Sequence, residues 1–123
     1  MMELTTVAKK VELFIPAPSC ACSGAAFLRD QEKISRMLAL VAELEERLPG
    51  VELVRHDLGD ESAYSDNLKV LARYLREAGE EEFASRIAFS LKFVLPAVAV
   101  DGRLVSYGKV PGTDEVVAAA GGI

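Results

Sequence analysis

Apolar and polar positions follow two different periods in the first half of the chain. A short apolar run over residues 11–15 ends at a proline, which predicts a buried strand leading into a loop. Residues 24–48 carry apolar side chains at helical spacing with charged residues between them, and Pro49 ends the pattern. Residues 51–58 then predict a second strand. A long helix between two strands requires a right-handed crossover and therefore a parallel strand pair.

The next segment predicts mainly helix. Either Ser65 or Asp66 is expected to cap a helix that ends at Gly79. Residues 80–91 predict an extra helical segment of one or two turns, whose glutamates at the start are expected to be solvated.

The last third predicts a hairpin and a closing helix. Residues 93–100 are apolar and β-branched and are interrupted only by Pro96, which predicts a strand. Asp101-Gly102 is a strong hairpin signal, and residues 103–107 are expected to return as the partner strand. A helix start at 111–115 leads into a short helix over 116–120. The whole pattern predicts an α/β fold, a three-layer sandwich around a four-stranded mixed sheet, in one domain over 1–123.

Composition narrows the function classes. The net charge is −5 at pH 7, which is unfavourable for binding nucleic acid. Apolar runs are too short for membrane insertion, and the start of the chain does not have the pattern of a secretory signal. We therefore expect a cytoplasmic protein in a reducing compartment.

The candidate chemistry lies on two cysteines in the predicted loop after the first strand. Cys20 and Cys22 are one residue apart, so they cannot cross-link distant parts of the fold. The loop is expected at the carboxyl end of a central strand and at a helix N-terminus, which favours a thiolate. Ser23 is expected to cap the helix, and the single histidine, His56, to have a structural role more readily than a metal-binding one.

Two sequence motifs have the positions that they have in thioredoxin-like proteins. Cys20 lies just before the N-terminus of a predicted helix, and Leu95-Pro96-Ala97-Val98 precedes the hairpin turn. With these motifs the sequence resembles the thioredoxin-like superfamily over almost the whole chain. The resemblance implies a cis peptide bond before Pro96 and a proline ring that faces the active-site cysteine. The usual Cys-x-x-Cys is absent: Cys20 takes the first position, Ser23 the second, and Cys22 stands between them.

A closer local resemblance is to the arsenic metallochaperones. It rests on Phe14-Ile15-Pro16-Ala17 before Cys20, on Cys22-Ser23-Gly24, and on the segments 51–55 and 57–58. That family has a thioredoxin fold and transfers As(III) or Sb(III) to an efflux ATPase from a site of three cysteines, two of them adjacent. This chain has two cysteines in total, separated by Ala21.

Three functions follow from these patterns. The leading interpretation is thiol–disulfide exchange with protein thiols or disulfides, in which Cys20 attacks, Cys22 resolves and Pro96 shapes the substrate groove, with no cofactor. The alternative is a chaperone that holds As(III) or another soft metal ion between Cys20 and Cys22 and passes it to an efflux ATPase or another metal-accepting protein. As(III) prefers three thiolates, so this alternative requires glutathione or a second subunit. The third is a fold retained for protein contacts alone.

Overall fold

The computed structural model describes residues 8–18, 22 and 24–121. Its elements in chain order are β1 (Lys10–Ile15), α1 (Ala25–Arg47), β2 (Glu52–Asp57), α2 (Tyr64–Glu77), α3 (Glu81–Ser85), α4 (Ile87–Val94), β3 (Ala97–Val100), β4 (Arg103–Tyr107) and α5 (Thr113–Ala119).

The four strands form one mixed sheet in the order β2-β1-β3-β4. β1 pairs with β2 in parallel, with Phe14 opposite His56, and β1 pairs with β3 antiparallel, with Phe14 opposite Ala97. β3 and β4 form an antiparallel hairpin with an irregularity between Val98 and Ala99. The predicted α/β class with a four-stranded mixed sheet is confirmed.

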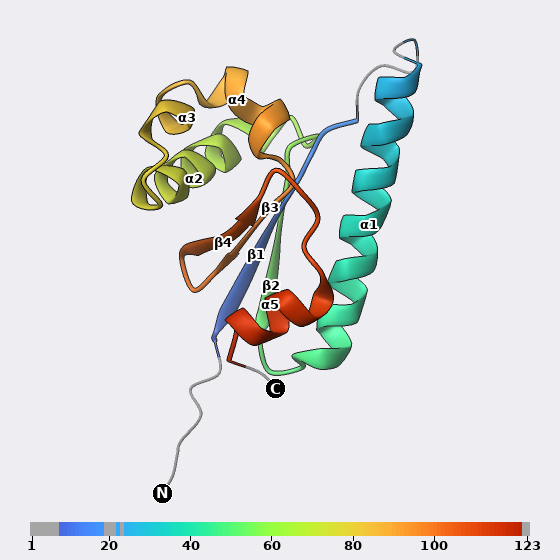
Figure 1. Ribbon diagram of the computed structural model, residues 1–123, viewed down its shortest axis with the longest axis vertical. Coiled ribbons are helices and arrows are strands. Elements are labelled where there is room, and N and C mark those ends of the chain that lie inside the picture. Colours follow the sequence, from blue (N-terminus) through green and yellow to red (C-terminus); the bar gives the residue numbers. More distant parts are fainter. Residues whose placement is uncertain (1–7, 19–21, 23, 122–123) are drawn as a thin grey trace, which may run out of the picture.

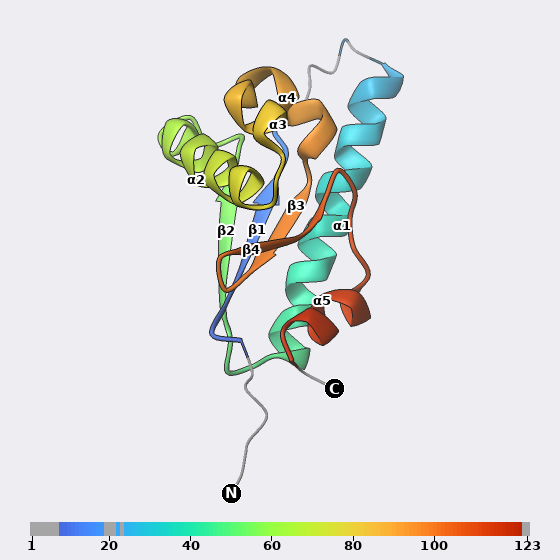
Figure 2. The same ribbon diagram turned by 60° about the vertical axis from the view of Figure 1, so that its left-hand side comes forward.

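Helices cover both faces of the sheet (Figures 1 and 2). α1 and α5 pack on one face, where Val11, Leu13 and Ile15 of β1 point. α2, α3 and α4 cover the other face, where Phe14 joins a second buried cluster. Alternate side chains of β1 therefore enter two separate cores, so both faces of the strand are covered.

The Asp101-Gly102 turn forms as predicted. Both residues have positive φ, 49° and 83°, which this tight hairpin turn requires. The Asp101 carboxylate also accepts hydrogen bonds from the backbone N–H groups of Lys9 and Lys10, with Oδ1 at 3.0 and 2.9 Å. The hairpin thus anchors the start of β1.

Two sequence expectations were wrong in this half of the molecule. The strand expected over 93–100 begins only at Ala97, because α4 continues to Val94 with Val94 buried in the second core. The helix ends there because Leu95 precedes a proline and takes an extended conformation, φ −98° and ψ 146°. α2 begins at Tyr64 with Ala63 at its N-cap and no side-chain cap, so neither Ser65 nor Asp66 caps it.

The extra helical segment forms two helices, α3 and α4. Of its three glutamates, Glu81 and Glu82 are exposed as expected, but Glu80 is half-buried and accepts a hydrogen bond from the Tyr107 hydroxyl. Within the described residues, no helix is both long and apolar enough to span a membrane.

Candidate functional site

The candidate dithiol belongs to the connection between β1 and α1 at the carboxyl end of the parallel strands. Cys22 is exposed, lies two residues before Gly24, the N-cap of α1, and is disulfide-bonded. Cys20 and Ser23 lie outside the described residues. Gly24 occupies the N-cap position of α1 with φ 63°, and the expected cap by Ser23 stays a prediction.

Pro96 lies at the same edge of the sheet. It immediately precedes β3, and the Phe14–Ala97 pairing places it beside the end of β1. The Leu95–Pro96 peptide bond is cis, the geometry that the sequence predicts, and the proline is fully buried. Its carbonyl accepts a hydrogen bond from Gly108 N–H at 3.0 Å. Whether the ring faces Cys20 stays a prediction, since Cys20 lies outside the described residues.

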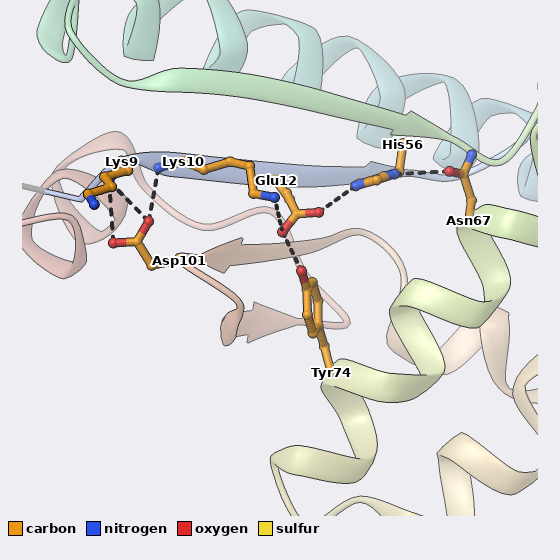
Figure 3. Close-up of polar contacts among 7 residues, drawn as sticks. All are labelled: Lys9, Lys10, Glu12, His56, Asn67, Tyr74 and Asp101. Atoms are coloured by element: carbon orange, nitrogen blue, oxygen red, sulfur yellow. Dashed lines mark hydrogen bonds and ion pairs between the residues drawn. The ribbon is translucent and has the colours of Figure 1, made fainter.

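The structure also contains a buried polar network that the sequence did not reveal (Figure 3). Glu12 of β1 is 4 % exposed and faces the α2 layer. Its Oε2 lies 2.8 Å from His56 Nε2, and its Oε1 accepts a hydrogen bond from the Tyr74 hydroxyl at 2.6 Å. Lys10 Nζ lies 4.0 Å from Oε1. In the sequence, the single glutamate within the apolar run 11–15 was the signal that could have revealed this network, because a buried carboxylate requires hydrogen-bonding partners.

His56 joins this network to α2. Its ring stacks on Phe14 with centroids 4.5 Å apart, and its Nδ1 lies 2.9 Å from Asn67 Oδ1. Asn67 donates from Nδ2 to the carbonyl of Asp57, which orients its oxygen toward the imidazole. The expectation of a structural role for His56 agrees with these contacts. In the described part of the chain, no group of three or more His, Cys, Asp or Glu side chains is placed to bind a metal.

These contacts shift the pKa values of two residues of the network, Glu12 and Tyr74. Burial acts to raise the pKa of Glu12, but hydrogen bonds from Tyr74 and His56 and the charges of Lys10 and His56 outweigh it, and the pKa lies below its ordinary value of 4.5. Burial, followed by the hydrogen bond to Glu12, raises the pKa of Tyr74.

The low pKa of Glu12 predicts acid-sensitive stability. A carboxyl whose pKa is lower in the folded state contributes stability above pH 4.5 and loses it as the pH falls through the folded-state pKa. We expect the free energy of unfolding of the wild type, measured by urea denaturation, to fall relative to that of Glu12→Gln as the pH drops below about 4.5. A constant difference between the two proteins from pH 7 to pH 3 would contradict this assignment.

The order of the elements, the mixed sheet and the cis-proline at its edge are those of a thioredoxin-like fold. A solved structure agrees: the crystal structure of an arsenical resistance operon trans-acting repressor from Bacteroides vulgatus is similar to this chain with a TM-score of 0.52. The two are 24% identical, and the alignment covers 93% of each chain. No protein-family model matches the sequence, and no curated protein is significantly similar to it.

Proposed function

We propose that this protein binds trivalent arsenic or a related metalloid through Cys20 and Cys22. The observation that supports this over the redox interpretation is the similarity, along 93% of both chains, to a protein from an arsenical resistance operon. The position of Cys22 at the start of α1 adds to it, because a soft metalloid is bound by thiolates and the helix N-terminus favours them. Pro96 lies at the same edge of the sheet and shapes the approach to the thiols.

The net charge of −5 makes DNA an unfavourable partner. The proposal therefore concerns metalloid binding and delivery to a metal-accepting protein such as an efflux ATPase.

The binding reaction is ligand exchange without electron transfer. Arsenous acid, As(OH)₃, loses its hydroxides as water when protein thiols supply their protons and bind arsenic as thiolates. A monosubstituted arsenical such as phenylarsine oxide needs only two thiolates: PhAsO and two thiols give PhAs(SR)₂ and one water. It is therefore the probe that matches a chain with two cysteines.

The reduced protein is expected to bind one phenylarsine oxide per chain. Cys20→Ser and Cys22→Ser should each lower the affinity by about 100-fold or more, because the second thiolate binds with a high effective concentration only when both are present. Calorimetric titration and mass spectrometry of the complex measure this. Ser35→Ala, an exposed serine on α1, is the matched control and should bind as the wild type does.

Two results would decide against this proposal. The double Cys20→Ser, Cys22→Ser variant must still unfold cooperatively, since loss of folding would make the pair structural.

Thiol–disulfide exchange is the second candidate function, favoured by the observation that Cys22 is disulfide-bonded. Unequal thiol acidities in alkylation over a pH series, a mixed disulfide trapped only in Cys22→Ser, and no arsenical binding would establish exchange instead.

A further inference from the structure

The helix α4 exposes two large aromatic side chains to solvent. Phe89 is 82 % exposed and Phe93 is 60 % exposed, whereas Ile87, Leu91 and Val94 of the same helix pack on the second core. The two phenylalanines are four residues apart, so they lie on one side of α4, one turn after the other. A helix that is apolar on all sides is normally covered on all sides, and an exposed apolar pair of this size indicates a contact surface.

A neighbouring helix holds this aromatic pair in place. The Phe93 ring stacks on Phe83 of α3, with ring centroids 6.5 Å apart and 22° between the ring planes. Phe83 is half-buried and packs against the second core. A rigid aromatic side chain that is already oriented loses little conformational entropy when a partner covers it.

The charges that accompany the aromatic pair on α4 are positive. Arg86 is the N-cap of α4, and Lys92 lies between the two phenylalanines, with its Nζ 5.2 Å from the centre of the Phe93 ring. In the part of the chain that the structure describes, neither cation forms an ion pair. This local excess of positive charge contrasts with the net charge of −5 of the whole chain, and it is complementary to an acidic partner.

We propose that the outer face of α4, formed by Arg86, Phe89, Lys92 and Phe93, is a docking site for an acidic amphipathic helix of a partner protein. The apolar side chains of that helix cover the two phenylalanine rings, and its carboxylates pair with the two cations. The cysteines take no part in this contact.

Size and charge argue against two other occupants of this face. The eight residues of α4 span about 12 Å, and two phenylalanines supply well under the roughly 800 Å² per partner of a stable protein–protein interface. A symmetric pair of α4 helices would also bring four cations together, which disfavours a second copy of this chain. An anionic membrane repels a chain of net charge −5. The face therefore fits a weak, transient contact with one short helix.

The probe for this site is a synthetic helical peptide of alanine, leucine and glutamate, about 15 residues long, with leucines at i, i+3, i+4 and i+7. Fluorescence anisotropy of the labelled peptide should show saturable binding with a Kd on the order of 100 µM. NMR chemical-shift changes of the protein amides should concentrate in α4 and α3. A peptide with lysine in place of glutamate, or with alanine in place of leucine, should bind at least about 10-fold more weakly.

Two double variants test the two halves of the contact. Phe89→Ala, Phe93→Ala should weaken peptide binding at least about 10-fold, because aromatic anchors supply most of the energy of a small interface. Arg86→Ala, Lys92→Ala should weaken it about 3- to 10-fold and reduce its salt dependence, as expected for two exposed ion pairs. All four side chains are exposed, so both variants should keep the fold.

The matched controls are Leu38→Ala, an exposed leucine on α1, and Lys69→Ala, an exposed lysine on α2, which should bind the peptide as the wild type does. The Cys20→Ser, Cys22→Ser variant should also keep peptide binding, so this result is independent of the proposed function. Absence of acidic-peptide binding up to about 1 mM, or equal binding of the acidic and basic peptides, would overturn the proposal. A dimer in sedimentation that the double phenylalanine variant dissociates, or phenylalanine-dependent binding to phosphatidylserine vesicles, would overturn it in favour of a second copy or a membrane.

Discussion

His56→Ala is expected to lower the free energy of unfolding by about 3–5 kcal/mol, the cost typical of leaving a buried charged group without its partner. The substitution leaves the Glu12 carboxylate, which is 4 % exposed, with the Tyr74 hydroxyl and the more distant Lys10. It also removes the ring that stacks on Phe14. Urea denaturation followed by far-UV circular dichroism at pH 7 measures the loss.

Two further variants test whether the loss comes from the pair itself. Arg55→Ala changes an exposed neighbour in the same strand and should alter stability by no more than about 0.5 kcal/mol. In the double variant Glu12→Gln, His56→Ala no buried carboxylate remains, so the combined loss should be smaller than the sum of the single losses. Strict additivity would show that Glu12 and His56 are not coupled.

Gly108→Ala should destabilise the fold by about 2–4 kcal/mol, the sum of backbone strain and crowding. Gly108 has φ 79°, and a Cβ there would lie 2.8 Å from the backbone oxygen of Phe93. Its N–H donates to the carbonyls of Val94 and Pro96, both at 3.0 Å, so the crowding falls on the corner that positions the cis-proline. Thermal unfolding by calorimetry measures the change.

Gly79→Ala is the matched control for this substitution. Gly79 also has positive φ, 91°, but a Cβ there meets nothing within 4 Å. It should therefore lose only the cost of the backbone conformation, about 1–2 kcal/mol. Equal losses at the two glycines would mean that the close approach of Gly108 to Phe93 contributes nothing.

The strands and helices with simple periodicity were predictable because their signals are local. The apolar run that becomes β1, the amphipathic pattern of α1 and the Asp101-Gly102 turn each depend on neighbouring residues. The segment before Pro96 was misread for the same reason. Its apolar residues suit a strand or a helix equally, and only the docking of Val94 in the second core decides for helix.

The sequence by itself determined the α/β class, the hairpin turn and the cysteine pair as the candidate chemistry, because local patterns along the chain carry these signals. Only the tertiary structure decided that Glu12, His56 and Tyr74 meet, since strand register and the docking of α2 bring together residues up to 62 positions apart.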